Sequence, residues 1–380
     1  MKNISTIGSL LTRKRNKAKK IGEDAPVYAV TNDKGFALST DLHDFTIHSE
    51  DTSNYLVVEK NDFAYNPSRL NIGSIAYFKN EGKGLISPMY VVFHADEEKI
   101  LAEYLFIVIK SEAIRNKIDS LKEIGARFRF DFERWNLIEI PLPSLTEQSR
   151  IVGILDTFTA AIDNIREQIA LRRKQFDYYR EELLSLEGKP GVEMKTITEV
   201  AKSYTGLTYK PENVSTTGTL VLRSSNIADD KLTFDDNVFV QMDIPERATA
   251  KEDDILICVR NGSKRLVGKA AVITKKADGM AFGAFMTVLR TTAINYKYLF
   301  FVWQSEKVKV QYKGDDAMPI AQITSKDFQR IVIPVPSHQE QQRIVTILET
   351  FEENIRNLEA QLVQREKQYE YYRNKLLSFE

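Results

Sequence analysis

The stretch EQSRIVGILDTF, residues 147–158, returns near the end of the chain as EQQRIVTILETF, residues 340–351. The two copies align without a gap at an offset of 193 residues, from Pro141 to Pro334. The match continues to their ends, where YYR at residues 178–180 faces YYR at residues 371–373. Self-similarity at a fixed spacing is typical of a repeated architecture. The chain is therefore predicted to consist of two half-units, each a variable segment followed by a closely repeated one.

Each repeated segment is predicted to form one long helix. Ser144 and Ser337 follow a Pro-x-Pro sequence that cannot itself be helical, and a glutamate stands three residues after each serine. This is the spacing of a capping box, so we expect the helices to begin here. Apolar residues then recur at steps of four and three, a seven-residue repeat typical of coiled coils. An antiparallel coiled coil with a pseudo-twofold axis is the simplest way to bury both apolar faces.

The predicted partner or coiled-coil interface takes equivalent positions from the two copies. Its residues are Ile162, Ile169, Arg172, Phe176 and Tyr179 in the first copy and Ile355, Leu362, Arg365, Tyr369 and Tyr372 in the second. Arg172 and Arg365 break the apolar pattern at the same place. A buried unpaired charge is costly, so each arginine is expected to extend to water, meet a carboxylate or face a partner protein.

The variable segments read as mixed structure. Short apolar runs suited to strands occupy residues 75–78, 90–93, 254–259 and 269–273, and helical patterns occupy residues 96–121 and 295–310. Each variable segment closes in an alternating, strand-like run, at residues 135–140 and 328–333. The expected fold class is α+β, with two globular domains separated by the two long helices. The expected boundaries are a first domain at 1–140, a helical segment at 141–187, a linker at 188–193, a second domain at 194–333 and a second helical segment at 334–380.

The composition indicates a folded soluble protein of a reducing compartment. Hydrophobic residues make up 43% of the 380 residues, and Cys258 is the single cysteine, so an intramolecular disulfide is excluded. The N-terminal stretch does not resemble a signal peptide, and no apolar run reaches membrane-spanning length. We expect a cytoplasmic protein without a membrane partner. Because 53 basic and 53 acidic side chains cancel, a nucleic acid would have to be held by local basic patches.

Basic and amide side chains gather at turns of both variable segments. The candidate DNA-binding residues of the first segment are Arg13, Arg15, Asn66, Ser68, Arg69, Asn71, Arg127 and Arg129. Those of the second are Thr208, Tyr209, Lys210, Arg260, Asn261, Ser263, Lys264, Arg265 and Lys269. Arginine and lysine neutralise phosphates, arginine and asparagine form paired hydrogen bonds with base edges, and neighbouring glycines allow close approach of the backbone. The alternative for any one of these stretches is an ordinary solvated surface.

No catalytic or metal-binding residue is predicted. The chain has no Gly-x-x-x-x-Gly-Lys-Ser/Thr phosphate loop, which argues against a nucleoside triphosphatase. The sequence NPSR at residues 66–69 lacks the second proline and the aromatic residue of the base-clamping loop of DNA amino-methyltransferases. Asp253 and Asp254 precede an apolar strand but lack a suitably spaced lysine, so they are interpreted as acidic turn residues. The four histidines, His43, His48, His94 and His338, show no metal-ligand spacing.

The repeated segments resemble a known family. IPLPSLTEQSRIV, residues 140–152, and IPVPSHQEQQRIV, residues 333–345, each close a variable domain and open a long helix. They resemble the conserved regions of the DNA specificity subunit of type I restriction–modification systems, and the resemblance covers essentially the whole chain. The turns YNPSRLNIGS, residues 65–74, and GSKRLVGK, residues 262–269, also look like those of the family's target recognition domains.

This resemblance implies that each variable domain is a target recognition domain that reads one half of a split double-stranded DNA target. It also implies that the helices form a spacer that docks two methyltransferase subunits. The resulting complex would methylate adenine, and restriction subunits would add translocation and cleavage. S-adenosylmethionine, ATP and Mg are then expected only in the partner subunits, with no cofactor in this chain.

The gapless repeat itself predicts a bipartite target with half-sites about one helical turn apart, roughly 10 bp centre to centre. The competing hypothesis is a coiled-coil scaffold whose end domains bind proteins. Steeply salt-dependent DNA binding would distinguish the two.

Overall fold

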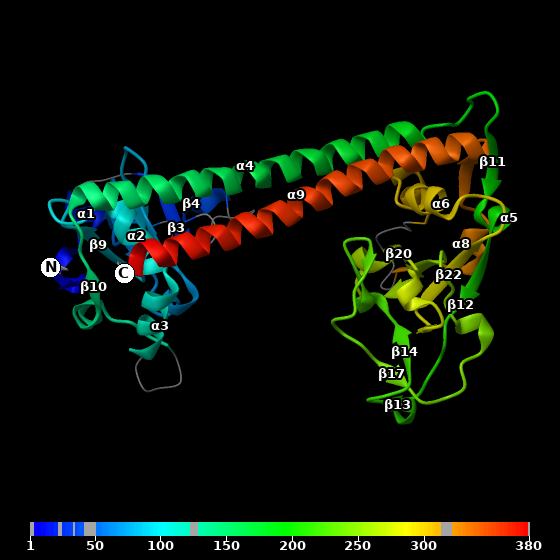
Figure 1. The fold of residues 1–380 in the computed structure, drawn as a ribbon, viewed down its shortest axis with the longest axis horizontal. Helices are drawn as coiled ribbons and strands as arrows, with labels where there is room; N and C mark the ends of the chain where they lie inside the picture. Colours follow the sequence, from blue (N-terminus) through cyan, green and yellow to red (C-terminus); the bar gives the residue numbers. More distant parts are fainter. Residues whose placement is uncertain are drawn as a thin grey trace. The chain divides into compact units, whose positions relative to one another are not determined.

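The computed structural model describes residues 4–21, 25–32, 35–41, 51–121, 128–312 and 321–378. It divides into two compact units (Figure 1). Unit 1 comprises Met1–Arg166 and Ala360–Glu380, and unit 2 comprises Glu167–Glu359. Each unit therefore contains one globular domain and a part of both long helices. The described residues include no helix with the length and apolar character needed to cross a membrane.

Each unit contains an antiparallel four-stranded sheet of the same topology. In unit 1 the strand order is β2 (Leu11–Lys14), β9 (Val91–Ala95), β6 (Asp62–Tyr65) and β7 (Ile75–Tyr77). In unit 2 it is β12 (Ala201–Thr205), β22 (Met286–Thr291), β18 (Ile255–Cys258) and β20 (Ala270–Val272). The four strands predicted from apolar runs are therefore confirmed as β7, β9, β18 and β20.

A second four-stranded sheet in each unit includes one parallel pair. In unit 1 its order is β4 (Gly35–Leu38), β3 (Val27–Thr31), β8 (Gly84–Ile86) and β5 (Leu56–Val58), with β3 parallel to β8. In unit 2 its order is β13 (Val214–Ser215), β17 (Phe239–Val240), β14 (Thr219–Leu222) and β21 (Ala281–Phe282), with β14 parallel to β21. The internal repeat therefore extends to the variable segments, whose sequences differ.

Small antiparallel ribbons complete the strands of the two units. In unit 1, β1 (Ile4–Thr6) pairs with β10 (Glu139–Pro141), and in unit 2, β11 (Glu193–Thr196) pairs with β24 (Val332–Val335). Unit 2 also has β15 (Ile227–Ala228) paired with β16 (Lys231–Leu232), and β19 (Arg260–Asn261) paired with β23 (Ala321–Gln322). The first two ribbons lead the chain from each domain into its long helix.

The predicted helical stretches at 96–121 and 295–310 are each interrupted by a serine. The first forms α2 (Ala102–Lys110) and α3 (Glu112–Ser120), and the second forms α6 (Tyr296–Trp303) and α7 (Glu306–Tyr312). The Ser111 hydroxyl donates to the carbonyl of Val108 at 2.7 Å, and the Ser305 hydroxyl donates to that of Val302 at the same distance. Each serine oxygen also accepts from an amide of the next helix, so one residue ends the first helix and caps the second. The remaining short helices are α1 (Ala18–Ile21), α5 (Ile197–Val200) and α8 (Ser325–Phe328).

The alternating runs at 135–140 and 328–333 are only partly strands, which corrects the prediction. Trp135 and Leu137 belong to the 3-10 helix η4 (Phe132–Leu137), and Phe328 ends α8. Trp135 and Phe328 are both buried, at 0% and 2% exposure. A short helix buries each of these aromatic rings, and the following strand buries its own apolar residues. Alternation in the sequence does not distinguish this arrangement from a continuous strand.

The two long helices begin where the serines predicted. They are α4 (Leu145–Leu184) and α9 (His338–Ser378), and the hydroxyl oxygens of Ser144 and Ser337 each accept from a backbone amide three residues on, at 3.3 Å. The glutamates at those positions do not complete a capping box. Each pairs instead with the arginine three residues further on, at 2.6 Å for Glu147 and 2.7 Å for its equivalent. The Arg150 guanidinium holds the pKa of Glu147 below its ordinary value.

The glutamine of each repeated Glu-Gln-x-Arg motif is a buried joint between helix and domain. The Gln148 Oε1 atom accepts from the Leu101 amide at 2.8 Å, and Nε2 donates to the carbonyls of Lys99 and Pro143 at 2.9 Å each. The equivalent Gln341 accepts from the amide of residue 295 and donates to the carbonyl of residue 336, both at 2.9 Å. Both glutamines are buried, at 0% and 1% exposure. The most strongly repeated motif is therefore structural.

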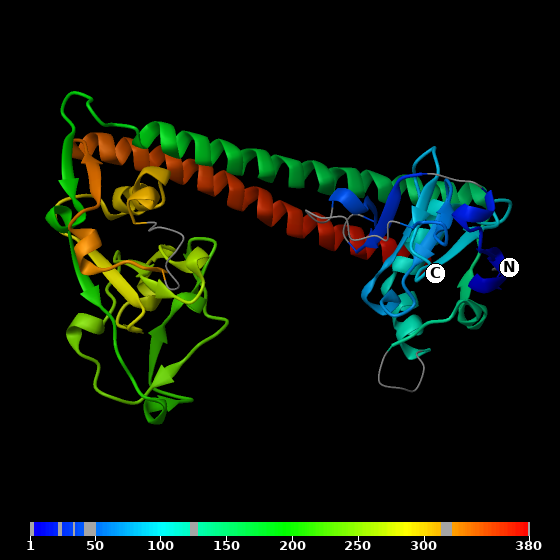
Figure 2. The ribbon, with the colours of Figure 1, turned by 180° about the vertical axis from the view of Figure 1, so that it is seen from behind.

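In unit 1, α4 and α9 lie side by side (Figures 1 and 2). The ring of Phe158 stacks on that of Tyr372 at a centroid distance of 5.2 Å, and Arg166 pairs with Glu366 at 2.7 Å. Higher residue numbers on α4 meet lower numbers on α9. The two helices are therefore antiparallel, as the repeated seam predicts.

In unit 2 the same contacts recur with the two helices exchanged. Tyr179 stacks on Phe351 at a centroid distance of 5.3 Å, and Arg173 pairs with Glu359 at 2.7 Å. At the offset of 193 residues, the aromatic pair is the equivalent of the one in unit 1. Both ion pairs take their arginine from α4 and their glutamate from α9. The paired positions are therefore equivalent in the two copies, but the charges at those positions are opposite.

The predicted seam residues differ in burial. Ile162 and Ile169 are buried, and Phe176, Ile355, Leu362 and Tyr369 are half-buried. Tyr179 and Tyr372 remain 43% and 41% exposed, although their rings stack. Arg172 and Arg365 are exposed, and each donates to a glutamine three residues on, Gln175 and Gln368, at 2.9 Å. The repeated arginines therefore reach solvent on the same helix face in both copies.

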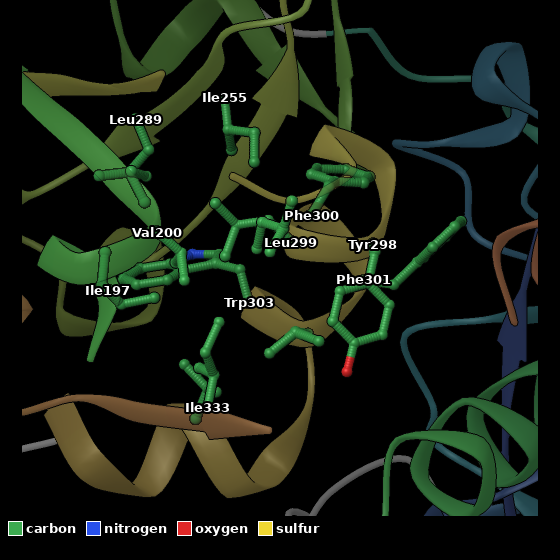
Figure 3. Packing of buried hydrophobic residues seen from close by; sticks show 14 of the residues in the cluster. Ile197, Val200, Ile255, Leu289, Tyr298, Leu299, Phe300, Phe301, Trp303 and Ile333 are labelled. Carbon is green, nitrogen blue, oxygen red and sulfur yellow. The ribbon is translucent and has the colours of Figure 1, made fainter. Parts of the chain in front are cut away.

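The core of each unit includes residues from its long helices. In unit 2, Tyr298, Leu299 and Trp303 of α6 pack with Ile255 and Leu289 of the first sheet (Figure 3). Leu184 and residues 344, 345 and 348 of the long helices join this cluster. In unit 1, residues 151 and 155 of α4 join the equivalent cluster. Each domain and the helix ends that it holds therefore form one hydrophobic core.

Candidate nucleic-acid interface

Two turns of the same structure connect equivalent strands in the two units. Residues 66–74 connect β6 to β7, and residues 261–269 follow β18 and lead into β20. The Oδ1 atom of Asn66 accepts from the amide of Ser68 at 2.9 Å, and that of Asn261 accepts from the amide of Ser263 at 2.9 Å. Such asparagine turns fix the backbone at the start of each segment.

Each turn then continues in the same way. A short 3-10 helix follows, η3 (Leu70–Ile72) in unit 1 and η8 (Lys264–Leu266) in unit 2. A left-handed glycine comes next, Gly73 with φ 92° and Gly268 with φ 87°. These positive φ angles favour glycine over any residue with a side chain. The two glycine- and arginine-bearing turns that stood out in the sequence are therefore equivalent structures.

The unit 1 turn is braced from behind and exposes its polar tip. The side-chain amide of Asn32 donates to the carbonyl of residue 72 at 2.8 Å, and the Lys110 ammonium donates to that of residue 73 at 2.9 Å. Burial lowers the pKa of Lys110. Asn66 is buried at 8% exposure and Asn71 is half-buried, whereas Ser68 and Arg69 are exposed. Of these four candidate residues, Ser68 and Arg69 are therefore the ones placed to meet a ligand.

The unit 2 turn exposes Ser263, Lys264 and Arg265, while Asn261 and Lys269 are half-buried. The Asn261 side-chain amide donates to the hydroxyl of residue 224 at 3.2 Å. A Cβ added at the left-handed glycine would lie 2.3 Å from the hydroxyl oxygen of Tyr312, so a side chain there is excluded by space as well as by φ. By position in the turn, the counterpart of Arg69 is Lys264.

A second segment meets the chain just after β6 in unit 1 and just after β18 in unit 2. The amide of Phe130 donates to the carbonyl of Pro67 at 3.0 Å, and the amide of Ile323 donates to that of residue 259 at 2.8 Å. Phe130 and Ile323 are buried, and the residues before them, Arg129 and Gln322, are exposed. The sequence prediction included Arg129 and missed Gln322, which stands at the offset of 193 residues from it. The predicted residue Arg127 lies outside the described residues.

An exposed aromatic ring supports Arg260. The guanidinium of Arg260 lies 5.4 Å from the ring centroid of Phe285, which is 57% exposed. The amides of residues 259 and 260 donate to the Phe285 carbonyl at 3.0 and 3.3 Å. An exposed ring and a stacked guanidinium are typical of surfaces that contact nucleobases. Phe285 belongs to no sequence motif, so its contact with Arg260 is evident only from the structure.

The remaining candidates lie in other environments. Arg13 of β2 pairs with Glu133 at 3.6 Å and lies over an aromatic ring, and Arg15 is exposed just after the strand. In unit 2, Thr208 and Lys210 are exposed, and the Lys210 ammonium lies 3.7 Å from a carboxylate at residue 212. Tyr209 is half-buried and packs on a small apolar cluster. These residues offer charge or polarity without the braced geometry of the two turns.

Buried carboxylates lie at the ends of β6 and β18 opposite the two turns. Asp62 accepts from the Lys14 ammonium at 2.6 Å and contacts His94 Nδ1 at 2.9 Å. Asp254 accepts from Arg290 Nε at 2.8 Å and Nη2 at 2.7 Å. Each carboxylate also accepts a backbone amide at 2.8 Å. Paired and hydrogen-bonded in this way, Asp254 is a structural residue of its turn.

The other residues weighed for metal or acid chemistry have ordinary places. Asp253 has a left-handed φ of 68° in the turn before β18, and His338 is the first residue of α9. His43 and His48 lie outside the described residues. Within the parts of the chain that the structure describes, no group of three or more histidine, cysteine, aspartate or glutamate residues is arranged to hold a metal ion.

Comparison with known proteins gives one consistent family. The family model of the type I restriction modification DNA specificity domain matches residues 2–172 and 190–365. The chain is 30% identical over 322 residues to the type I restriction enzyme EcoR124I/EcoR124II specificity subunit of Escherichia coli, covering 78% of this chain and 76% of that protein. Each family match contains one variable domain and most of the helix that follows it.

Two solved structures share the fold. One comes from a study of complex assembly and conformational transition of the type I R-M system, with a TM-score of 0.67, 18% identity and coverage of 99% of this chain and 97% of that one. The other is the S subunit of the type I restriction–modification system of M. genitalium, with a TM-score of 0.56, 18% identity and coverage of 99% and 96%.

Proposed function

Because the chain belongs to the type I restriction–modification DNA specificity family, we propose that its two braced turns each read one half of a bipartite double-stranded DNA target. The chain recognises DNA as a specificity subunit and is a non-catalytic targeting subunit of its complex. The alternative of a protein-binding scaffold is not favoured. The proposal assigns the reading to two target recognition domains, residues 1–140 and 194–333.

One observation carries the proposal. The same turn is built twice, with the same asparagine turn, 3-10 helix and left-handed glycine, yet its exposed side chains differ between the units. Counted from the turn asparagines, Arg69 in unit 1 corresponds to Lys264 in unit 2, and at the offset of 193 residues Arg129 corresponds to Gln322. A shared scaffold with different exposed polar groups suits two readers of different half-sites, because base edges are distinguished by donor and acceptor pattern.

We also propose that two methyltransferase subunits dock on the paired helices, one on each unit. The support is a repeated exposed aromatic face, since Tyr178 and Tyr371 are 64% and 60% exposed and each stands edge-on to the neighbouring tyrosine. Exposed tyrosines at equivalent places are typical of protein interfaces. These subunits would bring S-adenosylmethionine, and restriction subunits that join them would bring the ATP and Mg chemistry.

The test is DNA binding by the chain together with its methyltransferase subunits. Arg69→Ala should weaken or relax recognition of one half-site and leave the other unchanged, and Lys264→Ala should affect only the other half-site. Duplexes mutated in one half-site at a time separate these outcomes. Equal loss on every sequence would mean that both residues contact phosphates only, and binding that ignores salt concentration would contradict DNA recognition altogether.

A further inference from the structure

We infer that one shared place, Arg129 in unit 1 and Gln322 in unit 2, sets the base preferred at one position of each half-site. The geometry points to guanine opposite Arg129 and adenine opposite Gln322. This inference rests on the proposed function, because it assumes that each unit reads one half-site. It goes further by assigning a base to a named side chain.

Three observations place the two residues alike. They stand 193 residues apart, which is the offset of the repeated helices, whereas the adjoining turns stand 195 residues apart, from Asn66 to Asn261. Each precedes a buried apolar residue, Phe130 at 0% and Ile323 at 2% exposure. The amide of that buried residue donates to a carbonyl just after the equivalent strand, that of Pro67 after β6 and that of residue 259 after β18, at 3.0 and 2.8 Å. The buried neighbour therefore anchors the backbone, and alternation along an extended chain turns the residue before it outward.

In unit 2 an arginine supported by an aromatic ring lies opposite Gln322. Gln322 of β23 lies directly opposite Arg260 of β19 in an antiparallel pair. Side chains of such opposed residues share one face of the ribbon and lie about 5 Å apart at Cβ. The Arg260 guanidinium is held over the Phe285 ring. The Gln322 side chain is exposed, and its side-chain amide has no hydrogen-bond partner among the described residues.

In unit 1 an ion pair at Nε orients the guanidinium of Arg129 and leaves its two terminal nitrogens available. Its Nε atom pairs with the carboxylate of Asp131 at 3.1 Å, and the side chain is exposed. The two terminal nitrogens point away from Nε in the planar group and can donate together. A carboxylate on Nε therefore holds the plane of the guanidinium while it leaves the two-pronged donor edge available.

The chemistry of the two side chains matches two different bases. Guanine presents two acceptors, O6 and N7, in the major groove, and an arginine donates to both. Adenine presents an acceptor, N7, and a donor, the N6 amino group, and a glutamine amide supplies the complementary pair. Each bidentate contact discriminates against the wrong base by about 5- to 150-fold.

The experiment selects bound duplexes from a randomised DNA library with the full chain assembled with its methyltransferase subunits. The wild type should select two half-motifs. Gln322→Arg should change one position of one half-motif from adenine to guanine, and Arg129→Gln should change one position of the other from guanine to adenine. Gln322→Ala should remove the preference at the same single position, by about 5- to 150-fold. The alanine variant keeps the test decisive if the larger side chain does not fit.

Two control variants match the change in net charge. Lys60→Gln and Glu252→Gln alter exposed residues at the ends of β6 and β18 opposite the turns, and they should leave both half-motifs unchanged. Variants at residues 129 and 322 that select the wild-type motif, or that lose affinity equally for every sequence, would overturn the inference while leaving the proposed function intact. A wild type that selects no bipartite motif would overturn the proposed function, and the base assignment with it.

Discussion

Replacing Gln148 by alanine tests whether the repeated Glu-Gln-x-Arg motif joins each helix to its domain. The substitution removes three hydrogen bonds, to the amide of Leu101 and to the carbonyls of Lys99 and Pro143, all between 2.8 and 2.9 Å. It leaves those groups without this partner and opens a cavity at the fully buried Gln148 site. At about 1 kcal/mol for each net hydrogen bond, with a contribution from the cavity, we expect the free energy of unfolding to fall by about 3–4 kcal/mol.

The assay is equilibrium urea unfolding of the full chain followed by circular dichroism. Gln341→Ala, which removes two hydrogen bonds in the other unit, should cost less, about 2–3 kcal/mol. The matched control is Gln361→Ala at an exposed position of α9, which should change stability by less than about 0.5 kcal/mol. A Gln148→Ala variant as stable as this control would refute the assignment of the motif to a structural joint.

Three further perturbations follow from the same contacts. Arg166→Glu should destabilise the chain by about 0.5–1 kcal/mol at low salt and by less in 1 M salt, and Glu366→Arg in the same chain should restore stability in thermal melts. Gly73→Ala should cost about 1–2 kcal/mol for its left-handed backbone, whereas Gly268→Ala should cost more because a tyrosine hydroxyl occupies the space; equal losses in urea unfolding would contradict this. The pKa of Glu147 is lowered in the folded chain, so its contribution to stability is present above the ordinary glutamate pKa and is lost as pH falls through the folded pKa. Glu147→Gln should therefore make the free energy of unfolding depend less on pH in the acid range.

The long helices and several strands were predictable because their signals are local. The serines after each Pro-x-Pro sequence begin α4 and α9, and the seven-residue apolar repeat predicts their antiparallel pairing. The capping box was only half right, because each glutamate pairs with the arginine three residues further on and not with the backbone amide. The strand-like runs before the helices were misread because a short helix can bury an aromatic ring that also fits an alternating pattern, as η4 does with Trp135 and α8 with Phe328.

The candidate interface was predictable only in part. The turns at 66–74 and 261–269 were found through their glycines, asparagines and arginines, which are short-range features. Phe285 and Gln322 were missed because each matters only through residues far away in the sequence, Arg260 in both cases. An alignment of the two repeats beyond the conserved helices pairs Gln322 with Arg129, so Gln322 could have been predicted from the sequence in this way.

In the proposed function, two equivalent units read two half-sites of one DNA target. The most direct measurement is the set of methylated adenines in the genome of cells that carry this protein with its methyltransferase subunits. We expect one bipartite motif with a fixed non-specific gap, its half-sites about 10 bp apart centre to centre. A single continuous motif, or two half-motifs at variable spacing, would contradict it.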